Sequence, residues 1–260
     1  MIKIAHEAPL SIFDKVQQLT DYDYFLVHLF EENIAYLEKA HECVRTGRET
    51  ILDNSIFELG TAFEPYKFAE WVEKLAPTYY IIPDVLEDSS GTLDSFENFM
   101  DNYKNIPGKT IAVAQGNSYE DMVKCYNYLV HDNRVDKIAI SFDYCFFDEA
   151  KGDNKYARYM NGRQDLIKRM LKEDVINTDK PHHLLGCGLP QEFKAYTKYD
   201  WIDSLDTSNP VIHGMKEIWY DAQGLTNKES VKLFTLINED VNEHWAIIDY
   251  NIKTFRSYCR

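Results

Sequence analysis

Side chains that could carry out chemistry stand at the ends of short apolar runs along this chain. They are carboxylates, amides, a hydroxyl and a glycine-lined turn: Asp53, Asn54, Asp84, Gln115, Gly116, Ser141, Asp143, Gly186, Cys187, Gly188, Asp203 and Asp206. Carboxylates that share a pocket suit reactions at an acetal-like carbon, because one can attack as a nucleophile while another transfers a proton to the leaving group. A further carboxylate beside an amide can bind the hydrogen-bonding edge of a heterocycle. We therefore expect glycosyl transfer, although other reactions use the same residue types and a strand-end Asp is also a common turn former or helix N-cap.

Eight apolar runs of strand length follow one another, each before a stretch with helical character. They cover residues 2–5, 24–30, 49–55, 79–84, 109–116, 136–143, 182–188 and 200–206. Their apolar character is continuous rather than alternating, as in strands that are covered on both faces. Amphipathic helices are expected over residues 64–76, 92–103 and 118–130, and Ser118 has the position of a helix-start residue. The pattern predicts an α/β fold, a (β/α)8 TIM barrel, with its site at the carboxyl ends of the strands.

The expected organisation is a single barrel domain over residues 1–226 with a helical extension over residues 227–260 that packs on the barrel. In the extension, apolar residues from Val231 to Ile252 recur at three- and four-residue spacing. No linker, low-complexity run or internal repeat divides the chain. An open doubly wound sheet is the alternative, but no GxGxxG follows the first apolar run.

The composition restricts the compartment of the protein. The five cysteines are odd in number, far apart and never in a CxxC pair, so we expect reduced thiols with neither a disulfide framework nor a cysteine zinc site. No apolar run reaches membrane-spanning length, and the first residues lack a basic stretch followed by an apolar one. We therefore expect a cytoplasmic protein that does not bind a membrane.

The formal net charge of −15 bears on nucleic-acid binding, which usually relies on positive surface. One stretch, from Lys151 to Lys172, is locally basic and could equally be the solvated face of a helix. Within it, Arg158 and Arg163 are the candidates for contact with a nucleic-acid backbone. The pair His182 and His183 is expected to be buried or solvated rather than to bind a ligand.

Five sequence blocks occur in the order and spacing of a known family. They span about residues 50 to 215 and read ILDNSIFELG, IIPDVLED, IAVAQGN, HHLLGCGLPQEF and WIDSLDTSNP. The most specific are LGCGLPQEF and WIDSLD, which match the family's glycine–proline turn and its IDxFD strand. On these blocks the chain resembles the tRNA-guanine transglycosylase superfamily, in its smaller, phage-type branch, related to enzymes that insert 7-deazaguanine bases into DNA.

The resemblance implies a role for each matching residue. Asp206 would be the nucleophile that attacks C1′ and expels guanine, and Asp53 would be the general acid and base. Asp84 would bind the N1 and N2 edge of the base, and Gln115 would bind its O6. The remaining substrate-binding residues would be Gly116, Ser141, Gly186, Cys187, Gly188 and Asp203. A covalent glycosyl-enzyme intermediate would then accept a deazapurine with net retention.

Three departures from the family modify this expectation. The segment from Asp53 to Glu58 reads DNSIFE, where the family has Asp-Ser-Gly-Gly-Phe-Gln. The sixth run ends in SFDYCF instead of a glycine-rich stretch, which predicts a pocket reshaped for a different base. No cysteine–histidine zinc subdomain follows the eighth run, so DNA is favoured over tRNA, and neither a metal nor a cofactor is expected.

The sequence thus predicts a base-exchanging pentosyltransferase whose partners are nucleic acid and a free deazapurine base. The alternatives are an N-glycosyl hydrolase or transferase of free nucleosides or nucleotides, and a catalytically silent barrel that binds a purine-like ligand or a protein. The resemblance also implies a homodimer, and a phage-encoded chain would act in the host cytoplasm. Replacing Asp206 with Asn would separate catalysis from a binding role.

Overall fold

The computed structural model describes all 260 residues. Eight strands form one sheet in the order β1-β8-β7-β6-β5-β4-β3-β2, and the registered pairs are parallel. The strands are β1 (Lys3–His6), β2 (Asp23–Leu26), β3 (Thr50–Asp53), β4 (Tyr79–Ile81), β5 (Lys109–Val113), β6 (Lys137–Ser141), β7 (His182–Leu185) and β8 (Ile202–Thr207).

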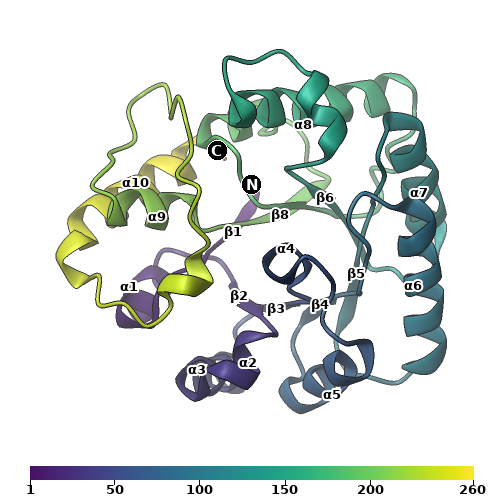
Figure 1. The fold of residues 1–260 in the computed structure, drawn as a ribbon, viewed down its shortest axis with the longest axis horizontal. Coiled ribbons are helices and arrows are strands. Elements are labelled where there is room, and N and C mark those ends of the chain that lie inside the picture. Colours follow the sequence, from purple (N-terminus) through teal and green to yellow (C-terminus); the bar gives the residue numbers. More distant parts are fainter. The chain divides into compact units, whose positions relative to one another are not determined.

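The α-helices alternate with these strands along the chain (Figure 1). They are α1 (Phe13–Gln17), α2 (Leu29–Glu32), α3 (Ile34–Arg45), α4 (Ile56–Leu59), α5 (Pro65–Leu75), α6 (Ser89–Asn102), α7 (Tyr119–His131), α8 (Lys155–Lys172), α9 (Asn209–Met215) and α10 (Trp245–Tyr258). The fold is the (β/α)8, TIM-barrel-like α/β fold that the sequence predicts. None of the helices combines the length and the apolar character needed to span a membrane.

All eight predicted strands are present, but the second has wrong bounds. It was expected to stay extended to Phe30, whereas residues Leu29–Glu32 form α2. A continuous apolar run cannot separate a buried strand from a buried helical turn. The helical region expected from about Asn227 contains two short 3-10 helices, Leu233–Leu236 and Asn242–His244, and its regular helix, α10, begins at Trp245. The preceding stretch bonds to the N-terminal segment instead, since the Leu10 N–H donates to the Ile237 carbonyl at 2.9 Å.

Residue contacts divide the chain into two compact units, each with a core of its own. The first unit comprises Met1–Asp21, Ser141–Lys172 and His183–Arg260. The second unit comprises Tyr22–Ile140 and Glu173–His182. Residues 227–260, expected as an extension, therefore belong to the first unit together with the first strand of the sheet.

The first unit is organised around β1, β8 and the last helices. Strands β1 and β8 pair in parallel with Ala5 opposite Asp206. Helices α9 and α10 pack against each other (Figure 1). Their buried apolar residues form one cluster with the N-terminal segment: Ala8, Ile12, Val16, Val211, Ile212, Leu233, Val241, Ile248 and Ile252. This packing supports the carboxyl end of β8, where Asp206 lies.

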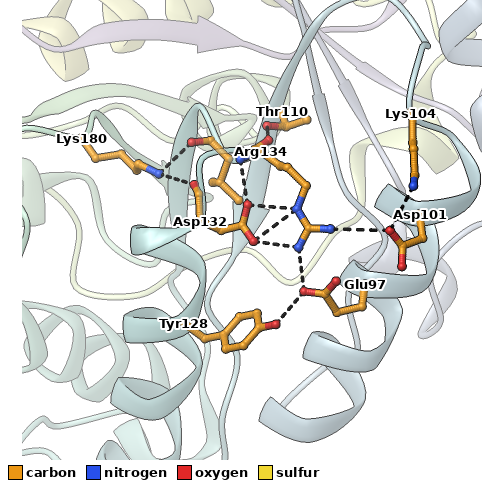
Figure 2. Close-up of polar contacts among 9 residues, drawn as sticks. Glu97, Asp101, Lys104, Thr110, Tyr128, Asp132, Arg134 and Lys180 are labelled. Carbon is orange, nitrogen blue, oxygen red and sulfur yellow. Dashed lines mark hydrogen bonds and ion pairs between the residues drawn. The ribbon is translucent and has the colours of Figure 1, made fainter.

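The second unit is organised around β2 to β5, which pair in sequence order. Helices α5, α6 and α7 cover the strands with apolar and aromatic side chains, and Phe99 contacts both Phe68 and Tyr80. The Ser118 side chain accepts a hydrogen bond from the Asp121 N–H and so caps α7, as the sequence predicts. An ion cluster centred on Arg134 lies on this unit, before the start of β6 (Figure 2).

Candidate active-site clusters

The residue expected to act as nucleophile, Asp206, is held at the carboxyl end of β8 by two donors. Its Oδ1 accepts hydrogen bonds from His183 Nε2 at 3.0 Å and from the Gly186 N–H at 3.2 Å. Because both donors reach the same oxygen, Oδ2 has no donor. The side chain keeps 9% of its exposure. A carboxylate with one oxygen bound and the other open is suited to nucleophilic attack. We call Asp206, His183, Ser204 and Gly186 the Asp206 cluster.

His183 lies on β7 and joins two residues of β8. Its Nδ1 is 2.9 Å from Ser204 Oγ, and its Nε2 faces Asp206. Ser204 and Asp206 project from the same face of β8 because they are two positions apart. Ser204 is fully buried, whereas Asp206 is nearer the strand end and partly exposed. The Ser–His–Asp set thus presents its carboxylate rather than its hydroxyl, which argues against a serine nucleophile.

Arg163 is buried beneath the turn that follows β7. Its guanidinium donates to Glu192 Oε1 at 2.6 Å, to the Leu185 carbonyl at 2.9 Å and to the Gly186 carbonyl at 3.0 Å. The prediction that Arg163 contacts a nucleic-acid backbone is wrong, because its side chain is 0% exposed and its guanidinium is bound by protein. Arg163 instead binds the last carbonyl of β7 and the first carbonyl of the following turn, whose Gly186 N–H binds Asp206.

The turn itself, Gly186–Cys187–Gly188, has little free space around it. Gly186 adopts φ +64°, and a Cβ there would lie 2.6 Å from a ring carbon of Phe142. Burial raises the pKa of the Cys187 thiol well above its usual range, so the thiol stays protonated. The expected contribution of this turn to binding therefore rests on its backbone groups.

Lys228 reaches the same turn from a distant part of the sequence. Its Nζ donates to the Cys187 carbonyl at 2.8 Å and lies 4.4 Å from the ring centroid of Phe142. Burial lowers the pKa of Lys228, while the charges of Asp143 and Asp206 act in the opposite direction. Lys228 could not be identified from the sequence, because it lies in a turn-rich segment with no strand or motif around it.

A second cluster, in the second unit, is built around Asp84. Asp84 Oδ1 accepts from Asn54 Nδ2 at 2.8 Å, and Oδ2 accepts from Gln115 Nε2 at 2.7 Å. Burial raises the pKa of Asp84 to about 6, although the hydrogen bonds from Gln115 and Asn54 act to lower it. We call these three residues the Asp84 cluster. The sequence placed all three at strand ends, and the structure brings them together.

The two amides of the Asp84 cluster have fixed orientations. Gln115 Oε1 accepts from the Glu87 N–H at 3.1 Å, so its Nε2 must face the carboxylate. Asn54 Oδ1 accepts from the Ile56 N–H at 2.9 Å, while its Nδ2 also donates to the Ile82 carbonyl at 3.0 Å. Gln115 therefore keeps one N–H for a ligand, and each oxygen of the Asp84 carboxylate keeps a lone pair.

Asp53, the expected acid and base, ends β3 in the same unit. Tyr24 Oη donates to its Oδ2 and the Ser55 N–H donates to its Oδ1, both at 2.5 Å. Ser55 adopts φ +63°, a left-handed conformation that turns its N–H back toward the carboxylate. These two donors fix the orientation of the carboxylate. Sequence reasoning missed Tyr24, which comes from a different strand.

Other expected binding residues have local partners. Ser141 Oγ donates to Asp143 Oδ1 at 2.6 Å at the end of β6. At Gly116, a Cβ would lie 2.4 Å from the Met122 backbone nitrogen, so glycine is required there for the close approach of α7. This packing requirement accounts for Gly116 without a ligand.

Two further expected residues lie outside the clusters. Asp203 is three positions before Asp206 on β8, so its side chain projects from the opposite face of the strand and does not join the Asp206 cluster. Arg158 forms an ion pair with Asp148 at 3.1 Å and keeps 32% of its side-chain exposure. Its contact with a nucleic-acid backbone stays a prediction.

The clusters carry acid–base and nucleophilic groups rather than metal ligands. No group of three or more His, Cys, Asp or Glu side chains is arranged to hold a metal ion. Comparison with models of protein families and with curated proteins found no match to this chain. The functional conclusion therefore rests on the geometry of the Asp206 and Asp84 clusters and on the sequence blocks that contain them.

Proposed function

We propose that this protein is a glycosyltransferase that exchanges a guanine-type base for a 7-deazaguanine-type base in nucleic acid, more readily in DNA than in tRNA. The observation that carries the proposal is the hydrogen bonding of the Asp206 carboxylate. One oxygen of its carboxylate is bound by His183 and Gly186, and the other is open. That arrangement suits a nucleophile that forms a covalent bond and later leaves again.

The reaction would proceed by two displacements at the sugar C1′. Asp206 Oδ2 forms a bond to C1′ while the bond from C1′ to the base nitrogen breaks, and the departing base takes the electron pair and then a proton. The resemblance assigns that proton transfer to Asp53. The deprotonated ring nitrogen of the incoming base then attacks C1′, and the electron pair of the ester bond returns to Asp206. Two inversions give net retention.

The Asp84 cluster supports a guanine-type base. Adjacent ring and exocyclic N–H groups on one edge of guanine match a carboxylate that keeps a lone pair on each oxygen. The remaining N–H of Gln115 matches the neighbouring carbonyl O6. The fixed amide orientations support this assignment, since they present a donor beside two acceptors.

The charge distribution favours a second candidate, which is N-glycosyl hydrolysis or transfer on free nucleotides. The net charge is −15, and both arginines expected to contact a nucleic-acid backbone are bound by carboxylates of the protein. Arg163 is buried against Glu192, and Arg158 is paired with Asp148. A small substrate would need no extended positive groove.

A base-exchange assay tests the proposal and separates the two candidates. The protein is incubated with radiolabelled guanine and, in separate reactions, with single-stranded DNA, duplex DNA, tRNA and guanosine monophosphates. We expect label to enter DNA with the wild type and not with Asp206→Asn. Label in monophosphates alone would favour the second candidate. A folded wild type that exchanges no base into any acceptor and releases no free base from the monophosphates would contradict both.

A further inference from the structure

His183 has no role in the expected mechanism, yet it is the side chain that contacts the proposed nucleophile. It is fully buried on β7, and both ring nitrogens have partners on β8. A buried histidine with two partners has a fixed ring plane and one fixed tautomer for a given charge state. Its position is therefore set by the fold and not by a substrate.

The contacts at the two ring nitrogens define the protonation pattern. An ionised carboxylate is an acceptor only, so a neutral His183 must carry its proton on Nε2, which is 3.0 Å from Asp206 Oδ1. Nδ1 is then an acceptor, and the Ser204 hydroxyl at 2.9 Å is the donor that suits it. The chain of donors runs from Ser204 through His183 to Asp206.

We infer that His183 is a positioning residue that acts through Asp206, and that it does so in both displacements; this inference rests on the proposed function. Its Nε2–H and the Gly186 N–H hold Oδ1, so Oδ2 is the oxygen that attacks C1′. When the second base arrives, the same two donors stabilise the carboxylate as the ester bond breaks. Hydrogen bonds to a charge that reforms in the transition state favour that step.

The lifetime of the glycosyl-enzyme tests this role. His183→Phe removes the donor while keeping a ring of similar size. We expect the adduct formed with DNA to break down about 10- to 100-fold more slowly when free guanine is added, because one hydrogen bond to the leaving carboxylate is lost. His183→Gln, whose amide can supply a donor in place of Nε2–H, is expected to restore most of the rate. Damage to the fold would reduce adduct formation but would not prolong the adduct.

His182→Phe is the matched control. His182 precedes His183 on β7 and therefore projects from the opposite face, where its Nε2 contacts Tyr126 Oη at 2.9 Å. Its replacement is expected to lower the melting temperature and to leave the adduct lifetime at the wild-type value. Equal lifetimes in His183→Phe and the wild type, or a His183→Gln variant no closer to the wild type than His183→Phe, would overturn the inference.

A spectroscopic measurement keeps the inference testable if no adduct forms. In ¹⁵N-histidine NMR spectra, we expect the Nε2 signal of His183 to show a bound, hydrogen-bonded proton, with a marked change in Asp206→Asn. A wild type without any adduct but with this signature would count against the proposed function and support the His183–Asp206 pairing. Signals of His183 that are indifferent to Asp206→Asn would overturn the pairing itself.

Discussion

Asp84 is the carboxylate of the candidate clusters whose environment shifts its pKa clearly. It is 3% exposed, and burial disfavours its charged form, so its pKa rises from 3.8 to about 6. A buried carboxylate that is still ionised at neutral pH opposes folding, and two amide donors offset only part of that cost. Strongly perturbed carboxyl groups of this kind concentrate at functional sites. A ligand-binding role for Asp84 accords with this environment.

The pKa of Asp84 leads to a prediction about stability and pH. Because the folded-state pKa lies above the unfolded value, ionisation opposes folding in full above pH 6, and this opposition fades as the pH falls toward 4. The unfolding free energy of Asp84→Asn minus that of the wild type should therefore be about 2 kcal/mol larger at pH 7 than at pH 4. Urea denaturation of both proteins at the two pH values measures this difference. If the difference in unfolding free energy between the two proteins did not change with pH, the raised pKa of Asp84 would be contradicted.

At the residue scale, the sequence allowed single candidate-site residues to be chosen, but it did not indicate which side chains contact them. Asp206, Asp84 and Gln115 could be chosen because polar residues after apolar runs lie at strand ends. Tyr24 and His183 could not, because each is placed beside a carboxylate by pairing between different strands. Arg163 illustrates the opposite failure, since a basic stretch in sequence does not reveal which of its members is buried.

The element that matters most for the Asp206 cluster is the turn after β7. The Gly186 N–H is aimed at Asp206 because Arg163 binds the carbonyls of Leu185 and Gly186, and because Gly186 adopts a left-handed φ. Phe142 fills the space where a Cβ would stand. The turn is thus specified by backbone conformation and by packing together.

Gly186→Ala is expected to destabilise the protein by about 2–4 kcal/mol and to slow adduct formation, since the clash with Phe142 displaces the N–H that binds Asp206. Gly47→Ala provides the matched control. Gly47 adopts φ +79°, and an added Cβ there would meet no atom within 4 Å. Its replacement should cost about 1 kcal/mol and leave activity unchanged. Equal effects of the two substitutions on stability and activity would refute the role assigned to the turn.

Among the elements, strand existence was predictable and helix continuity was not. Eight apolar runs gave eight strands, because buried parallel strands require unbroken apolar character. The apolar spacing from Val231 to Ile252 predicted a helical region, yet the first half of that stretch is bonded to the N-terminal segment. Periodic apolar residues show only that a segment is buried on one side. Which backbone partners it finds depends on the tertiary structure.

At the scale of the whole molecule, ends of strands away from the candidate clusters serve stability. Arg134, before β6, donates to Asp132 and Glu97 at 2.7 Å (Figure 2). Its guanidinium carbon lies 4.8 Å from the ring centroid of Phe96. Lys180, before β7, donates to the Asp132 carbonyl at 2.9 Å. Polar groups at the amino ends of barrel strands commonly contribute to stability rather than to chemistry.

Arg134→Ala is expected to lower the unfolding free energy by about 1–2 kcal/mol, an effect that shrinks at high salt, without changing activity. Lys168→Ala removes an isolated exposed pair with Asp165 and should cost less than about 0.5 kcal/mol. Thermal melts at low and high salt concentration compare the two variants. An Arg134→Ala variant that is as stable as Lys168→Ala would refute the stabilising role of the Arg134 ion cluster.

The central claim is that Asp206 forms a covalent bond to the sugar, and intact-protein mass spectrometry tests it most directly. The protein is incubated with guanine-containing DNA, denatured and weighed, with tRNA in a parallel sample. We predict a mass increase in the wild type and in the surface control Asp165→Asn, and none in Asp206→Asn. An adduct that persists in Asp206→Asn, or base exchange by a wild type that never carries an adduct, would contradict the account.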